Sequence, residues 1–101
     1  MKLLVVMSLK EYQKKVAQLL DQAKITVFSA TETMGVKDQQ ESNLLDNWFS
    51  SGSEQFDSIF QFSFTDAAKA DQALLLIKKY NAENDTGFPI RAFVLPVEKS
   101  T

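Results

Sequence analysis

The sequence predicts one α+β domain over residues 1–101, with strands and helices in the order β-α-β-β-α-β. Two observations give this order: the chain has four apolar or β-branched stretches, and an amphipathic stretch with helical spacing follows the first and the third of them. The four apolar or β-branched stretches predict strands, and they cover residues 2–7, 25–34, 55–65 and 90–97. The order is that of the ferredoxin-like fold, a four-stranded antiparallel sheet with two helices on one face.

The first strand is expected to pass directly into the first helix. Ser8 and Glu11 have the spacing of a capping box, so the helix should begin after Ser8. Apolar side chains then recur at helical spacing and predict the face that packs on the sheet. They are Leu9, Tyr12, Val16, Leu19, Leu20 and Ala23.

The second strand ends at Gly35, and the third alternates sharply between two kinds of side chain. Its polar face carries Asp57, Gln61 and Ser63, and its aromatic face carries Phe56, Phe60, Phe62 and Phe64. We interpret the phenylalanines as core residues. The alternative is a base-stacking face, as in RNA-recognition domains of the same topology. That alternative requires basic surroundings, and residues 55–65 contain no lysine or arginine.

The second helix is expected to begin at Thr65 or Asp66, either of which is a good capping residue. Its predicted inner stripe consists of Ala67, Ala70, Ala73, Leu74, Ile77 and Tyr80. A polar connection over residues 81–87 then leads to the last strand, where Pro96 indicates an edge position or the strand's end.

The first and last strands are apolar on both faces. Leu3, Val5 and Met7 alternate with Leu4 and Val6, and the last strand repeats the pattern with Ile90, Ala92 and Val94 against Arg91, Phe93, Leu95 and Val97. Two helices cover only one sheet face, so a monomer would expose an unusually large apolar patch. We therefore expect copies of the chain to associate through their sheets. The alternative is that the long connection over residues 36–53 folds back over this face.

Composition excludes several kinds of chemistry. The chain has no cysteine and no histidine, which removes disulfides, thiolate or imidazole metal sites and serine–histidine catalysis. No catalytic residue or metal site is predicted, and the sequence leaves any cofactor unknown. The net charge of -2 and the pI of about 5.0 disfavour nucleic acid as a partner. The apolar start is too short to cross a membrane and lacks a signal-peptide cleavage pattern, so we expect a cytoplasmic protein.

The connection over residues 36–53 is long for a link between neighbouring strands. Its apolar side chains recur at helical spacing after Ser42 and predict a short amphipathic segment that docks a protein partner. They are Leu44, Leu45, Trp48 and Phe49. The alternative is that they pack on the protein's own oligomer. The sequence does not decide whether this partner is a membrane protein.

Three stretches resemble the PII signalling proteins. Residues 92–98, Ala-Phe-Val-Leu-Pro-Val-Glu, are similar to the last PII strand, residues 25–27 to its second strand, and residues 34–37 to the start of its T-loop. Residues 87–97 are equally similar to the end of CutA proteins. Both families share the ferredoxin-like fold and form trimers with their sheets turned inward. The resemblance therefore implies a homotrimer, and PII proteins hold ATP or ADP between subunits.

Two basic residues, Lys37 and Arg91, lie beside the two loops that correspond to this cleft. With Gly35 and Gly87 they are expected to meet across a subunit interface and hold an anion, next to Phe88. The chain departs from the PII pattern here, because Phe88-Pro89-Ile90 replaces most of the phosphate-binding glycines and proline has no N–H to donate. Glu32 is a candidate partner for the Arg91 guanidinium.

The leading hypothesis is a non-enzymatic, trimeric PII-like regulatory protein. It would bind a small ligand, for which a nucleotide is a candidate, at its subunit clefts and contact a partner through residues 36–53. One alternative is an interaction module that keeps the scaffold without the ligand. The other is a small enzyme on a dimeric ferredoxin-like barrel.

Overall fold

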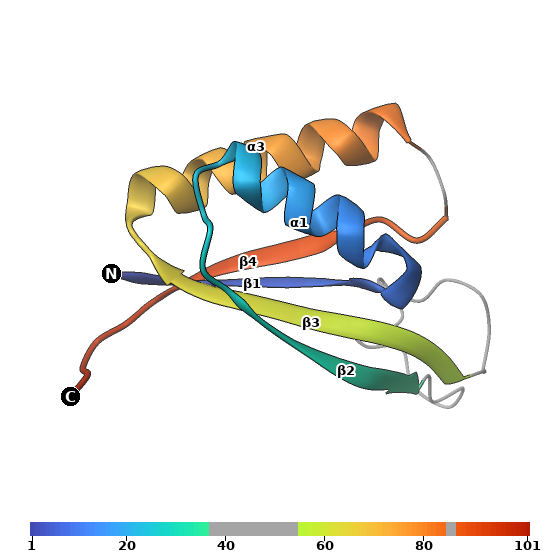
Figure 1. Cartoon of the computed structure of the whole chain (residues 1–101), viewed down its shortest axis with the longest axis horizontal. Coiled ribbons are helices and arrows are strands. Elements are labelled where there is room, and N and C mark those ends of the chain that lie inside the picture. The colour runs from blue at the N-terminus through green and yellow to red at the C-terminus, as the bar shows by residue number, and fades with distance from the viewer. Residues whose placement is uncertain (37–54, 85–86) are drawn as a thin grey trace.

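The computed structural model describes residues 1–36, 55–84 and 87–101. The strands are β1 (Lys2–Leu9), β2 (Ser29–Val36), β3 (Gln55–Thr65) and β4 (Arg91–Pro96). They form an antiparallel sheet in the order β2-β3-β1-β4. Helices α1 (Gln13–Gln22) and α3 (Ala67–Glu83) both lie on one face of it (Figure 1). The predicted ferredoxin-like fold is confirmed.

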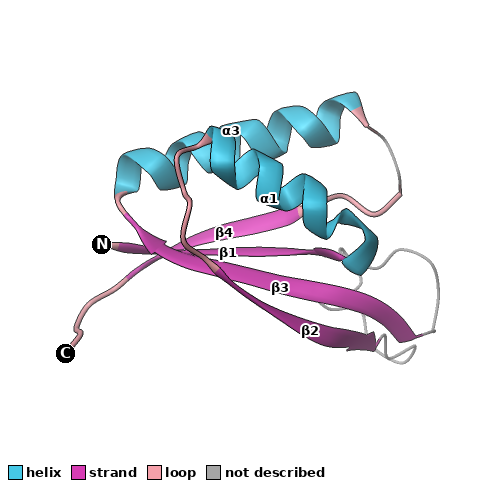
Figure 2. Ribbon diagram, in the orientation of Figure 1, coloured by secondary structure: helices cyan, strands magenta, loops and turns pink. Residues whose placement is uncertain are grey.

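The core lies between the helices and the sheet, the two layers that Figure 2 shows. Leu4 and Val6 of β1 are fully buried there beneath Val16 and Leu20 of α1 and Ile77 of α3. Burying one such aliphatic side chain contributes about 1.5–3 kcal/mol, so this layer supplies most of the favourable free energy of folding. In the described part of the chain, neither helix has the length and hydropathy that a bilayer crossing needs.

The first helix begins later than predicted. β1 continues through Leu9, which pairs with Ser58, and a 3-10 turn over Lys10–Tyr12 precedes α1. The Ser8 hydroxyl donates to the Leu9 carbonyl oxygen at 3.1 Å instead of capping a helix. The predicted capping box is therefore wrong, because strand pairing extends past the residues that would have formed it. In the predicted stripe, Val16, Leu19, Leu20 and Ala23 are buried as expected, whereas Leu9 belongs to β1 and Tyr12 to the 3-10 turn.

Helix α3 begins as predicted, with a side-chain cap. The Asp66 carboxylate accepts a hydrogen bond from the Lys69 backbone N–H at 2.8 Å. Ala70, Ala73 and Ile77 form the buried stripe. The helix continues to Glu83, beyond the predicted end at Tyr80, so that Asn81 is helical and not part of the connection.

Strand β2 starts at Ser29, four positions later than predicted, and continues past Gly35 to Val36. Strand β3 has the predicted bounds but the opposite orientation. Gln61 and Ser63 are buried beneath the helices, and Phe64 is 59% exposed on the other face. The prediction that the phenylalanines belong to the core is wrong for the single chain.

Candidate functional site: an apolar sheet face and the β4 loop

The sheet face turned away from α1 and α3, which we call the open face, carries a continuous apolar surface. Cross-strand pairing places β1, β3 and β4 side chains in rows, such as Val5 between Phe62 and Phe93. Phe64, Phe93 and Leu95 are 59%, 45% and 44% exposed. The apolar members of the open face are Leu3, Val5, Met7, Phe60, Phe62, Phe64, Phe93 and Leu95.

The open face becomes polar toward one edge. Strand β2 contributes Ser29, Thr31 and Thr33 to it, all exposed. The Thr33 and Ser58 hydroxyls are hydrogen bonded at 2.6 Å, which ties β2 to β3 on this face. An apolar centre with a polar margin is the usual anatomy of a protein–protein interface. Soluble monomers rarely leave a continuous apolar surface of this kind in contact with water.

The orientation of β3 strengthens this interpretation. Gln61 and Ser63 occupy the face where helices supply apolar neighbours, and Phe60, Phe62 and Phe64 occupy the face without helices. Ser63 is satisfied by donating to the Val27 carbonyl oxygen at 2.6 Å. The Gln61 amide is buried with no hydrogen-bond partner among the described residues. This arrangement suits a strand that is covered on both sides.

The loop before β4 contains Gly87 and Phe88, two of the residues predicted to bind a ligand, and it leads directly into a third, Arg91, the first residue of β4. Asn81 of α3 fixes this loop through both of its amide atoms. Its Nδ2 donates to the Ile90 carbonyl oxygen at 2.7 Å, and its Oδ1 accepts from the Ile90 N–H at 3.0 Å. Asn81 was not singled out from the sequence. The one feature that could have indicated its role is an amide side chain near a helix end, because such an amide can pair with a backbone N–H and C=O as another backbone would.

Gly87 adopts a φ of 80°, a conformation that favours glycine. A Cβ added there would meet no atom within 4 Å, so the backbone conformation and not crowding selects the glycine. Phe88 is half-buried beside it. Arg91 is the first residue of β4 and pairs with Met7. This register places Arg91 on the open face, at the end of the sheet where the loop enters β4.

The predicted ligand residues do not all meet within one chain. Gly35 lies on edge strand β2, and Arg91 lies on the opposite edge strand β4. The two intervening strands separate these edges by about 14 Å. Both residues do lie at the same end of the sheet, where β2 ends and β4 begins (Figure 1). Lys37 lies outside the described residues, so its place in this arrangement stays a prediction.

The sequence makes Glu32 a candidate partner for Arg91, but the two residues do not pair. Its side chain is on the helix side of β2 and forms an ion pair with Lys10 at 2.6 Å. The hydrogen bond to Glu32, together with its charge, raises the pKa of Lys10 above its ordinary value. Because the two side chains are 50% and 65% exposed, the pair contributes little to stability.

The predicted partner-binding residues, Leu44, Leu45, Trp48 and Phe49, lie outside the described residues. Whether that segment covers the open face of its own chain therefore stays untested. Within the described part of the chain, His, Cys, Asp and Glu side chains form no group of three that would hold a metal ion. A shallow apolar hollow lies at the far end of β3 and is lined by Met1, Phe64, Thr65 and Asp66.

Comparison with known proteins identifies the scaffold and no activity. No protein-family model matches the chain, and no curated protein matches it. Among solved structures, it is similar to a protein of the DUF3240 family from Shewanella baltica OS155, with a TM-score of 0.60 and 17% sequence identity. The match covers 99% of this chain and 92% of that one. At this level of identity the likeness is one of fold, over the full length of the domain.

Proposed function

We propose that this chain is a PII-like regulatory protein that assembles through its open face into a homotrimer. The observation that carries the proposal is the orientation of β3, with Gln61 under the helices and Phe60, Phe62 and Phe64 on the side without them. A second layer of protein over that face would remove the phenylalanines from water. Each fully buried aromatic side chain would then contribute about 1.5–3 kcal/mol to assembly.

The loop held by Asn81 is the proposed ligand-binding element, and Arg91 is its anchor. The cleft forms between subunits, because Gly35 of one chain lies on the edge opposite Arg91. A small anionic ligand, with a nucleotide as the first candidate, binds there and biases the segment over residues 36–53 toward one conformation. Such a ligand acts as a signal only if it binds one conformation more tightly than the other. The protein is proposed to be non-enzymatic and to pass the signal to a protein partner through Leu44, Leu45, Trp48 and Phe49.

Light scattering of the full chain tests the assembly. The proposal expects three times the monomer mass for the wild type and a large fall in mass for Phe64→Asp or Leu95→Asp, which place a charge in the open face. Val27→Asp is the matched control, because Val27 is 82% exposed and lies outside that face. A wild-type monomer would overturn the proposed assembly, and a dimer would favour the barrel-type enzyme.

Calorimetry tests the ligand. We expect binding of one member of a panel of adenine nucleotides, cyclic nucleotides and 2-oxoglutarate, and loss of that binding in Arg91→Ala with the trimer intact. Absence of binding across the panel in an intact trimer would favour the second candidate, an interaction module without a ligand. Phe88 and Pro89 support that candidate, since they stand where PII proteins have glycines. Its signature would be loss of partner binding in Trp48→Ala without a change in mass.

A further inference from the structure

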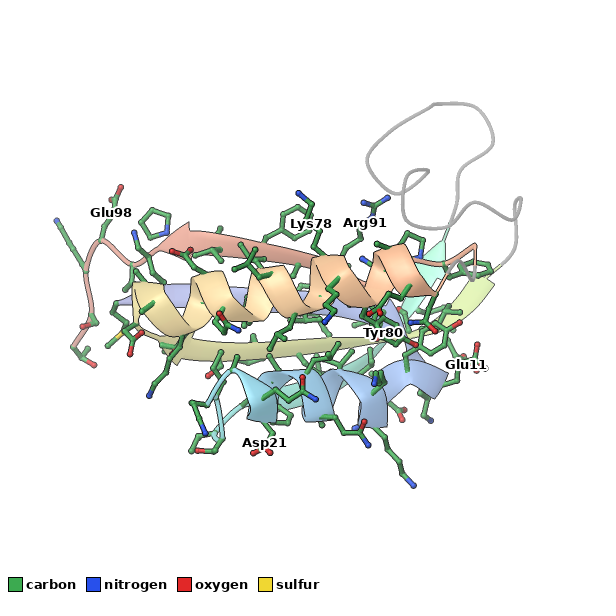
Figure 3. All side chains as sticks on the ribbon, turned by 90° about the horizontal axis from the view of Figure 1, so that it is seen from above. Glu11, Asp21, Lys78, Tyr80, Arg91 and Glu98 are labelled. Atoms are coloured by element: carbon green, nitrogen blue, oxygen red, sulfur yellow. The ribbon has the colours of Figure 1, made fainter. Side chains whose placement is uncertain are left out.

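Helix α3 has a second apolar patch, on the side of the molecule opposite the open face. Leu75 is 62% exposed at the centre of the outward side of the helix. With Leu74 and two charged residues, Asp71 and Lys78, it lines a shallow, largely apolar hollow. In Figure 3, Lys78 points away from α1, over the outer edge of β4. We call Asp71, Leu74, Leu75 and Lys78 the α3 patch.

The charges of the α3 patch make it complementary to a second, antiparallel copy of itself. Asp71 lies one turn before Leu75 and Lys78 about one turn after it, so the patch runs from acid through apolar to base along the helix axis. An identical patch laid antiparallel across it would bring Asp71 of each copy next to Lys78 of the other. A parallel copy would bring like charges together. The patch is therefore complementary to itself in one orientation only.

Neither charged residue is engaged within the described part of the chain. The ion pairs found there join Lys10 to Glu32 and Lys69 to Asp66, and both Asp71 and Lys78 are exposed. Small side chains flank the patch, because Ala68 and Ala82 lie about two turns on either side of Leu75 and are exposed. Small residues at these positions let two helices approach closely enough for the central leucines to touch.

We propose that the α3 patch is a homotypic docking surface, on which α3 of a second copy lies antiparallel with the leucines in contact and reciprocal Asp71–Lys78 ion pairs at the two sides. This contact goes beyond the proposed function and does not depend on it, because it uses the opposite side of the molecule. A single pair of helices buries less than the roughly 1,200 Å² of a standard interface, so the association is weak and depends on protein concentration. It joins in pairs the species that the open face produces, and larger assemblies follow where one species presents several α3 patches.

Sedimentation velocity from micromolar to near-millimolar protein tests the docking surface. The wild type should double in mass as its concentration rises. Asp71→Lys and Lys78→Asp each place like charges at both sides of the contact and should weaken doubling about ten-fold or more. An equimolar mixture of these two variants should recover doubling, since every lysine at the contact again faces an aspartate. Recovery by mixing cannot arise from misfolding of either variant.

The matched control makes the same charge changes on α1. Asp21→Lys and Lys14→Asp alter exposed residues of that helix and should leave the doubling of each variant unchanged. Three results would each overturn the proposal: a wild type that never doubles, single α3 variants that double like the wild type, or a mixture that does not recover. None of these depends on whether the starting species is a trimer, so failure here is distinguishable from failure of the open-face assembly.

Discussion

Gln61 and Phe62 are consecutive residues of β3, and the glutamine points toward the helices while the phenylalanine points into the open face. Gln61 is 1% exposed and neither of its amide atoms has a hydrogen-bond partner among the described residues. A buried polar group without a partner costs about 1–3 kcal/mol. The chain thus places a costly residue of β3 in its core and Phe60, Phe62 and Phe64 of the same strand on the open face, which is reasonable only if the open face is itself covered.

Replacing Gln61 should therefore make the chain more stable. Gln61→Met keeps an unbranched side chain of similar length and removes the unpaired amide, so we expect the free energy of unfolding to rise by about 1–3 kcal/mol. Urea denaturation measures the change. Gln72→Met, at an exposed position of α3, is the control and should change stability by less than about 0.5 kcal/mol. A clear loss of stability in Gln61→Met would show that the amide is hydrogen bonded in the folded protein and would contradict this prediction.

Among the described residues, the sequence predicts the existence and type of the strands and of α1 and α3, but not which side of β3 is inside. Alternation of phenylalanine with glutamine and serine shows that the two faces differ. It does not show which face meets the helices, because an aromatic face is equally well buried by helices or by another subunit. The pattern of β1 and β4 is more informative, since strands apolar on both faces require two covering layers whatever their orientation.

Local signals failed where tertiary pairing competed with them. Ser8 and Glu11 have the spacing of a helix start, but pairing of Leu9 with Ser58 extends β1 past them. Glu32 is a candidate partner for Arg91 in the sequence, but the two lie on opposite faces, which only the strand register reveals. Asn81 gave no recognisable signal, because its role depends on the position of Ile90 in a loop that returns to the sheet.

The Lys10–Glu32 ion pair predicts a dependence of stability on pH. Because the folded pKa of Lys10 is raised, the pair's contribution is fully present below the ordinary lysine pKa of 10.5 and is lost as the pH rises through the folded value. Glu32→Gln should therefore be slightly less stable than the wild type at neutral pH and no less stable in strong alkali. Thermal unfolding at both pH values tests this, with Glu83→Gln as an exposed control. A difference that persists unchanged in alkali would contradict it.

Gly87 should resist substitution for a conformational reason alone. At a φ of 80°, alanine costs about 1–2 kcal/mol even though its Cβ would meet nothing within 4 Å. Asparagine tolerates this region better than alanine, so Gly87→Asn should lose less stability than Gly87→Ala. Urea denaturation of the two variants orders them. Equal losses would mean that side-chain size and not backbone conformation limits the position.

The last prediction concerns the clamp between Asn81 and Ile90, which holds the proposed ligand loop against α3. Asn81→Ala removes both hydrogen bonds and leaves the partly buried Ile90 N–H and carbonyl without them, so we expect a loss of about 1–3 kcal/mol. Asn84→Ala is the matched control, because Asn84 also donates to a backbone carbonyl, that of Tyr80 at 3.0 Å, but in an exposed position. Its loss should be less than about 1 kcal/mol.

Hydrogen exchange separates a local effect of the clamp from a general one. In Asn81→Ala, the Ile90 amide should exchange much faster, while amides of β1 should change only as far as global stability falls. Calorimetry on the same variant then links the clamp to function: a ligand that contacts Gly87, Phe88 or Arg91 should bind more weakly, because it must first order the loop. Unchanged affinity together with fast exchange at Ile90 would place the ligand elsewhere and remove this loop from the candidate site.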